Sequence, residues 1–220
     1  MDWIEPAWPA PPQVRALTTT RCGGTSSGTY ASLNLADHVG DDPACVARNR
    51  QRLVERLSLP AAPVWLRQVH GVTVVDAGKF DAPAGADASV AAQAGVVCAV
   101  LTADCLPLLL CDRAGTRVAA VHAGWRGLLA GVLERAAEVV EAAVAVDLGE
   151  VLLGILVSAL GVGEQPEGEL HLRHLGVARP GLEELLVGGA EFQEVALDDP
   201  GEPGRIERLG DEKAVAVLFE

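Results

Sequence analysis

Three side chains that can bind a transition metal lie at the ends of strand-like segments. Cys105 closes the stretch "LTADC", His122 lies near the end of "TRVAAVHAG", and His70 precedes glycine in "LRQVHG". Two imidazoles and a thiolate form a good ligand set for zinc. Three protein ligands leave a fourth position open, where a zinc-bound water can lose a proton near neutral pH. The residue types therefore predict a catalytic metal site.

Strands must bring these residues together. If the strands ending near Cys105 and His122 are parallel neighbours, both side chains lie at one edge of a sheet, where α/β folds usually place their sites. Apolar and β-branched runs predict strands, and apolar stripes at helical spacing predict helices. The expected strands cover 14–21, 62–78 (two short strands), 96–102, 106–112, 116–124, 150–160 and 212–219, and the expected helices cover 41–59 and 128–145. Strands interleaved with helices predict a layered α/β fold.

The composition is that of a globular protein. The chain has 220 residues, of which 50% are hydrophobic, enough for one large domain with its own core. We therefore expect a single domain over residues 1–220. No basic N-terminal stretch precedes an apolar one, and the strongly apolar run at 151–163 is too short and glycine-rich to span a bilayer. These features predict a soluble, cytoplasmic protein with no membrane partner.

Charge is unevenly distributed along the chain. The formal net charge is −13, and residues 141–220 account for −12 of it, with 17 acidic and five basic residues. No basic surface is evident, which excludes duplex nucleic acid as an expected partner. An anionic substrate must be held by local donors, because the overall field repels it.

Five separated motifs, in order along the chain, match a known family. They are "TTTRCGGTSSGTYASLNLADHVGDDPACVARNR", "LRQVHG", "GADA", "LTADCLPLLL" and "VHAGWRG". Together they closely resemble the YfiH-like family, also called the laccase-domain or polyphenol oxidase family, over about residues 12–145. The resemblance implies an α/β fold, namely a layered α/β/α sandwich with a mixed sheet. It also implies that His70, Cys105 and His122 bind zinc.

The resemblance further implies an enzyme that acts on purine nucleosides. Family members are purine nucleoside phosphorylases, which use phosphate to cleave adenosine, inosine, guanosine and methylthioadenosine to free base and ribose 1-phosphate. Some members also deaminate adenosine. The expected partners are a small-molecule nucleoside and phosphate, and nothing in the sequence indicates an oligomeric state. Phosphate needs cationic or amide donors, and the available ones are Arg21, the amides of Gly23 and Gly24, and Arg126. Together with Asn34, these are the predicted substrate-binding residues.

Deamination needs a carboxylate that moves protons, and Asp104 is the nearest carboxylate in sequence. In extended backbone, Asp104 and Cys105 point to opposite faces, so Asp104 needs a bend to reach the site, and Pro107 makes one possible. An equal alternative is that Asp104 is a buried residue bound to loop amides. The predicted catalytic residues are Asp104, Cys105 and His122.

Residues 164–220 form an acidic segment that departs from the family pattern. The family's GPAIG segment, Cys-Thr loop and Phe-Ser-Tyr-Arg-Arg segment have no clear counterpart here, so this segment is a divergent replacement or the product of a reading-frame change. We expect it to leave sheet edges uncovered. Proteolysis should then begin at 163–168 or 198–204 and leave a core of residues 1 to about 160.

Three other functions could use the same residues. The first is a copper-dependent polyphenol oxidase, although a blue-copper site usually has an axial methionine and the only methionine is Met1. The second is a metal-free cysteine hydrolase with Cys105 as nucleophile and His122 as base. The third is a non-catalytic protein whose closed structural zinc site is completed by Cys98 or Cys111.

Overall fold

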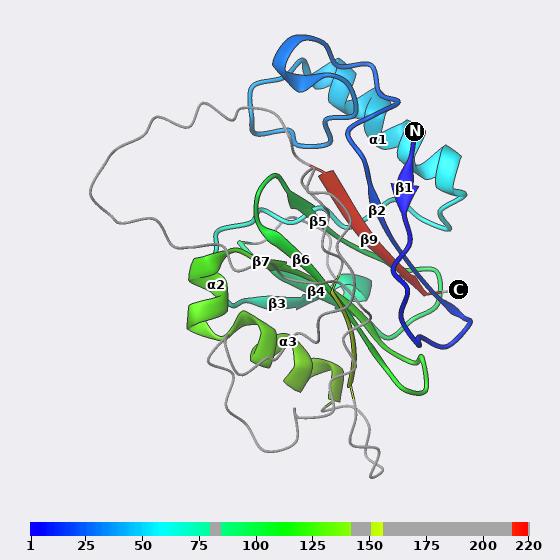
Figure 1. Ribbon diagram of the computed structural model, residues 1–220, viewed down its shortest axis with the longest axis vertical. Helices are drawn as coiled ribbons and strands as arrows, with labels where there is room; N and C mark the ends of the chain where they lie inside the picture. Colours follow the sequence, from blue (N-terminus) through cyan, green and yellow to red (C-terminus); the bar gives the residue numbers. More distant parts are fainter. Residues whose placement is uncertain (80–84, 142–150, 156–212, 220) are drawn as a thin grey trace, which may run out of the picture.

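Two β-sheets packed face to face form the centre of the molecule, with helices on the outer sides (Figure 1). The computed structural model describes residues 1–79, 85–141, 151–155 and 213–219. Within these residues the first sheet has the order β1 (Trp3–Ile4), β2 (Val14–Thr19), β9 (Lys213–Phe219) and β5 (Val97–Thr102). The second sheet has the order β3 (Val74–Asp76), β4 (Ala88–Ala91), β7 (Val118–Ala123), β6 (Leu106–Asp112) and β8 (Val151–Ile155). Short 3₁₀ turns cover Gly28–Tyr30 and Ala77–Lys79.

The predicted α/β sandwich with a mixed sheet is confirmed, and two stacked sheets lie between its helices. β3 and β4 are parallel, whereas β4, β7, β6 and β8 are antiparallel neighbours. The segment 62–78 contains one strand instead of the two expected, because Val64 and Arg67 make only isolated bridges. The sequence did not predict β4, whose four residues are all buried and therefore show no alternation of polar and apolar side chains.

Helix α1 (Pro43–Leu57) covers the outer face of the first sheet. It begins at Asp42, whose side chain accepts the Ala44 N–H at 2.9 Å, and proline suits its first turn. It ends at Ser58, which has a left-handed backbone. Its buried side chains, Leu53 and Leu57 among them, share an apolar cluster with Leu17 of β2. The helix predicted over 41–59 is thereby confirmed.

The helix predicted over 128–145 is two helices in the structure, α2 (Trp125–Ala130) and α3 (Val132–Glu141). Gly131 separates them with a φ of 92°, a conformation that side-chain-bearing residues rarely adopt. Residues 142–145 lie outside the described part of the chain. Buried Ala136 and Val140 pack α3 onto the second sheet. No helix in the described residues has the length and apolar character needed to cross a membrane.

The space between the sheets is filled by apolar side chains and two thiols. Cys98 and Cys111 lie there beside Val100 and Leu109. Burial raises the pKa of each thiol to about 12, so both stay protonated near neutral pH. The alternative in which Cys98 or Cys111 completes a closed zinc site is therefore wrong, because these side chains belong to the core.

Strand β9 closes the first sheet, as the pattern at 212–219 predicted. It pairs with both β2 and β5, so it occupies an inner position. Thr18 and Val100 both lie opposite Val215, which makes β2 and β5 parallel to each other. The segments that follow β2 and β5 therefore emerge at the same end of the sheet, where these two strands finish. The candidate site lies at this edge, which is formed by strand ends.

Candidate metal centre

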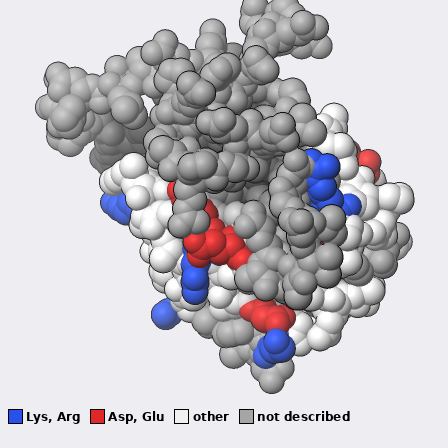
Figure 2. Space-filling model, turned by 90° about the horizontal axis from the view of Figure 1, so that it is seen from below, with Lys and Arg blue, Asp and Glu red and all other residues white. Residues whose placement is uncertain are grey.

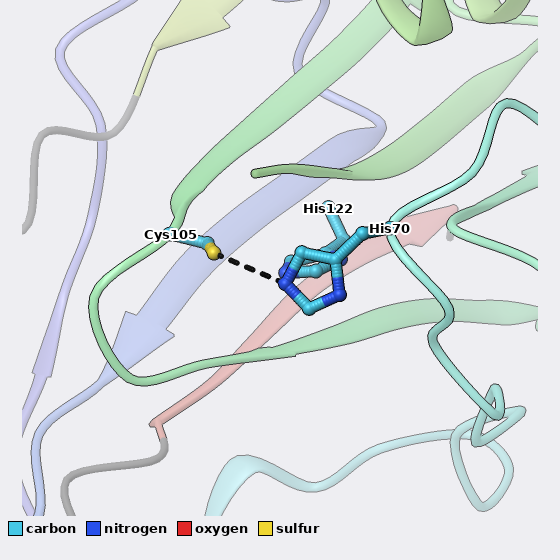
Figure 3. A group of neighbouring side chains, drawn as sticks. All are labelled: His70, Cys105 and His122. Atoms are coloured by element: carbon cyan, nitrogen blue, oxygen red, sulfur yellow. Dashed lines mark hydrogen bonds between the residues drawn. The ribbon is translucent and has the colours of Figure 1, made fainter. Parts of the chain in front are cut away.

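The three predicted metal ligands lie together in the structure (Figure 3). One ligand atom from each of His70, Cys105 and His122 lies within 4.8 Å of the others. Cys105 Sγ is 3.7 Å from His70 Nε2, and the two imidazole rings meet edge to face with centroids 4.7 Å apart. In a tetrahedral zinc site, ordinary bond lengths separate such donor atoms by about 3.3–3.6 Å. The residues therefore fit a zinc ion after only a small contraction.

The strand arrangement behind this group differs from the predicted one. β6 and β7 are antiparallel, with Pro107 opposite His122. Cys105 lies in a bend at 103–105, which leads from β5 in the first sheet into β6 in the second. The start of β6 and the end of β7 thus meet at one edge. The prediction of parallel neighbouring strands was wrong, although the edge position that it implied is the one observed.

His122 faces the space between the two sheets. Val118 and Ala120, on the same side of β7, belong to the core between the sheets, and alternation along the strand puts His122 on that side. Its residue surface is only 3% exposed. The imidazole is therefore held at the end of the core between the sheets.

His70 is positioned by a segment that runs beside β5. The Gln68 side chain accepts the Leu101 N–H and donates to the Leu101 carbonyl, both at 2.7 Å, and so pairs with the edge of β5 like another strand. Two residues later His70 has a φ of 57°, in the left-handed region. This turn carries the ring toward Cys105 (Figure 3). We did not predict the role of Gln68, since its partner is distant in sequence.

Asp87, just before β4, joins the two histidine segments and is a functional residue that sequence reasoning missed. Its fully buried carboxylate accepts the backbone N–H groups of Val69, His70 and Gly71 and lies 2.9 Å from His122 Nδ1. Burial acts to raise the pKa of this carboxyl. The hydrogen bonds from His122 and the three amides outweigh it, so the pKa lies below its ordinary value. The available signal was an acid within the GADA motif, beside a strand of small and mostly apolar residues, where it must find buried partners.

Gly124 gives the metal ligands the room they need. A Cβ atom there would lie 2.7 Å from His70 Cδ2 and 3.1 Å from Cys105 Sγ. The first distance is shorter than real Cβ contacts. The backbone of Gly124, with φ −66° and ψ 152°, suits any residue, so the requirement for glycine is purely steric.

We expect Gly124→Ala to lower zinc affinity about tenfold or more, because His70 and Cys105 must move apart to admit the methyl group. Titration with zinc against a chromophoric chelator measures this. Gly71→Ala is the matched control, since a Cβ there would meet Asp87 and Val69 only at 3.5 Å, an ordinary contact. Equal zinc affinity in the two variants would contradict the steric role.

Asp104 and Arg126 flank the metal group in sequence, and both are exposed. Asp104 lies in the bend beside Cys105, so the alternative of a buried residue at this position is wrong. Arg126 follows the glycine at the start of α2, and its guanidinium lies 4.9 Å from the ring centroid of Trp125. Both side chains can therefore meet a substrate that approaches from solvent.

The predicted glycine-rich loop follows β2 and is shaped by its own hydrogen bonds. Arg21 donates from Nε and Nη2 to the Ala31 carbonyl, at 2.9 and 2.7 Å. The amides of Gly23 and Gly24 both donate to Ser32 Oγ, at 3.0 and 3.2 Å. A phosphate held by these amides must therefore replace the serine hydroxyl.

Asn34 lies in the interior of the same loop. It is buried, its amide nitrogen donates to the Ala36 carbonyl and to Asp41, and its oxygen accepts the Ala36 N–H. These bonds use the side chain to shape the loop. The structure brings Asn34 into this network, and it does not belong to the His–Cys–His group.

Charged side chains of the described residues are spread over the one face of the molecule that Figure 2 shows. On the face shown in Figure 2, basic and acidic groups of the described residues form small separate patches without an extended basic area.

The fold and the site together define the class of protein. It is an α/β sandwich of two stacked sheets with a candidate transition-metal site, the His–Cys–His group, where strand ends of the two sheets meet. Residues 15–159 match the family described as multi-copper polyphenol oxidoreductase laccase, and the chain belongs to this family. The resemblance to the YfiH-like family is confirmed by the same match and by relatives of that name.

Relatives with known names match part of the chain. A purine nucleoside phosphorylase of Pseudomonas aeruginosa is 61% identical over 132 residues, which are 60% of this chain and 53% of that protein. The purine nucleoside phosphorylase YfiH of Escherichia coli is 57% identical over 132 residues, 60% of this chain and 54% of its own length. The chain thus spans about half the length of these curated relatives.

Solved structures show the same fold. A Neisseria meningitidis protein has a TM-score of 0.64 at 46% identity, covering 70% of this chain and 62% of its own. A Bacillus licheniformis hypothetical protein, YfiH, has a TM-score of 0.68 and covers 94% of this chain and 93% of its own. At 18% identity, this second likeness shows the fold alone.

Proposed function

We propose that the chain is a zinc-dependent purine nucleoside phosphorylase. The proposed substrates are adenosine, inosine, guanosine and methylthioadenosine, which phosphate converts to free base and ribose 1-phosphate. The observation that carries this proposal is the His–Cys–His group, whose donor atoms lie within 4.8 Å of one another. It lies within residues 15–159, which match the family, and relatives named purine nucleoside phosphorylase are 61% and 57% identical over 132 residues.

The residues suit a resident zinc. His70 and His122 would each supply a nitrogen and Cys105 a sulfur, leaving one tetrahedral position open. When bound, zinc supplies a Lewis acid and can activate a water molecule. His70 is exposed whereas His122 is buried, so the group has one side toward solvent and one toward the core. A substrate can therefore reach the open position from the His70 side.

Phosphate binding is assigned to donors on both sides of this edge. Arg21 and the Gly23-Gly24 loop follow β2, whose end lies at the same edge as the end of β5 that leads to Cys105. Arg126 lies in the first turn of α2, two residues beyond Gly124. Guanidinium groups hold phosphate through paired, charge-assisted hydrogen bonds. They would orient one phosphate oxygen toward ribose C1′ while the bond from C1′ to the base breaks.

Proton transfer is assigned to Asp104. Its exposed position beside Cys105 lets the carboxylate face a substrate at the metal group. In phosphorolysis Asp104 would control the transfer of the proton that the departing base acquires. In the proposed adenosine deamination, it would carry a proton from the attacking water to the leaving amine.

We expect Arg21→Ala to raise the KM for phosphate about tenfold or more, with a smaller effect on the KM for inosine, because it removes a charged donor from the phosphate site. The KM for phosphate of Arg21→Lys should lie between those of the unchanged chain and Arg21→Ala, since lysine keeps the charge but not the paired donors. Arg117→Ala is the control, as Arg117 precedes β7 at the end away from His122. An unchanged phosphate dependence in Arg21→Ala would refute this assignment.

A copper-dependent oxidase is the second candidate, favoured by the family description. The part of the chain that the structure describes contains one group of three or more His, Cys, Asp or Glu residues able to hold a metal. Met1, the only methionine, packs against the cluster under α1 and is not part of this group. We therefore rank the oxidase second to the zinc enzyme.

The metal-free cysteine hydrolase has less support. The imidazole 3.7 Å from Cys105 Sγ is that of His70, whereas the base assigned to this function is His122. All three candidate functions separate in one experiment, in which metal content and the products from inosine plus phosphate are measured together. Zinc with hypoxanthine and ribose 1-phosphate supports the proposal. Phosphate-independent hydrolysis without metal, or copper with phenol oxidation, overturns it.

A further inference from the structure

We propose that Asp87 is a positioning residue that assembles the metal site before any metal binds. Its carboxylate contacts both histidine segments, with Oδ1 2.9 Å from His122 Nδ1 and 2.8 Å from the His70 backbone nitrogen. Asp87 has no exposed surface, so water does not compete for these contacts. This inference rests on the proposed metal site but not on the proposed reaction.

Asp87 determines which nitrogen of His122 is available to a metal. The carboxylate already accepts the backbone N–H groups of Val69, His70 and Gly71, and an ionised carboxylate can only accept. The hydrogen shared with His122 therefore resides on Nδ1. The lone pair of the neutral ring is then on Nε2, the only ring nitrogen left for a metal. Carboxylate partners fix metal-binding histidines in this way.

Asp87 also holds His70 in an unfavourable backbone conformation. The φ of 57° at His70 lies in a region that residues with side chains seldom occupy. Three consecutive N–H groups, those of residues 69–71, point at the two oxygens of one carboxylate, at 2.7–3.3 Å. These bonds hold the turn that places His70 Nε2 3.7 Å from Cys105 Sγ. One side chain thus orients two of the three ligands.

Asp87→Asn tests this role with little change in size. An amide has one accepting oxygen, so its NH₂ group must face either the Gly71 N–H or His122 Nδ1. The first arrangement loosens the His70 turn, and the second transfers the His122 proton to Nε2. We expect zinc affinity to fall about 10–100-fold, the usual effect of losing an outer partner of a metal ligand.

Asp112→Asn is the matched control. Asp112 is also a buried carboxylate that accepts backbone N–H groups, those of Thr116 and Arg117, and it lies at the end of β6 away from Cys105. The Asp112→Asn variant should have lower thermal stability but unchanged zinc affinity. If Asp87→Asn binds zinc as tightly as the unchanged chain, or if both variants lose affinity equally, the proposal is overturned.

A second measurement needs no variant and decides the question if Asp87→Asn does not fold. Proton–nitrogen correlation spectra of the metal-free protein distinguish a protonated from an unprotonated ring nitrogen in His122. The proposal requires hydrogen on Nδ1 and none on Nε2 before zinc is added. The opposite tautomer, or a ring that exchanges between both, would overturn it. Neither measurement uses turnover, so failure of the proposed phosphorylase activity leaves this test intact.

Discussion

Cys105→Ala is expected to remove bound zinc and phosphorolysis together. The change leaves two imidazoles, and Cys105 supplies the only sulfur in the group. Loss of a direct ligand should cost more than the roughly 10–100-fold in affinity that loss of an outer partner costs. Elemental analysis of the purified protein and product formation from inosine plus phosphate measure the two losses.

The control for this prediction is Cys111→Ala. Cys111 is fully buried between the sheets, and burial raises its pKa to about 12, so alanine there should lower stability but leave zinc in place. His70→Ala and His122→Ala should resemble Cys105→Ala. Full zinc occupancy in all three single variants of the His–Cys–His group would exclude the proposed site.

The sequence predicted which residues form this group, but not how they meet. Cys105 and His122 could be placed at strand ends because apolar runs stop beside them. The expected pairing was wrong, because the strand before Cys105 and the strand of His122 lie in different sheets, which an apolar run does not reveal. Asp87 was missed because its importance comes from amides and an imidazole that are distant in sequence. Such contacts become visible only when the chain is folded.

The limits of helices and strands could be predicted where neighbouring residues set them, but not where the folded chain does. Asp42 and Pro43 mark the start of α1 by local chemistry, and the expected limits of 41–59 lie within two residues of the observed ones. Gly131 lies inside a continuous apolar stripe, so the pattern predicted one helix where the left-handed glycine divides two. For 212–219 the pattern predicted a strand, but only the sheet order shows that it lies between β2 and β5.

The inner position of β9 changes the expected role of the C-terminal segment. The departure from the family pattern suggested uncovered sheet edges and an independent core ending near residue 160. In the structure, β9 pairs through five residues with β2 and six with β5. A core that lacks residues 213–219 would leave β5 without its partner strand in this sheet and β2 paired with β1 alone. The expected core must therefore be extended to include this strand.

Ending the chain after residue 155 is thus expected to unfold the protein. The two ladders of β9 amount to about ten hydrogen bonds at about 1 kcal/mol net each, on the order of 10 kcal/mol, which is comparable with the whole stability of a typical domain. Thermal unfolding followed by circular dichroism measures the loss. The truncated chain should show no cooperative transition and should not bind zinc, since the end of β5 leads directly to Cys105.

Limited proteolysis of the full chain provides the matched comparison, because it cuts the connection without removing the strand. Cleavage at 163–168 or 198–204, where glycine, proline and glutamate are frequent, should leave the fragment that carries residues 213–219 bound to the N-terminal fragment. The two should elute together in native buffer and separate in denaturant, and the nicked complex should keep its zinc.

A truncated chain that unfolds at the same temperature as the full chain and binds zinc equally well would show that β9 contributes little to the sheet. Loss of both the unfolding transition and zinc binding would assign β9 a structural role at the metal site. This strand joins β2, which precedes the glycine-rich loop, to β5, which precedes Cys105.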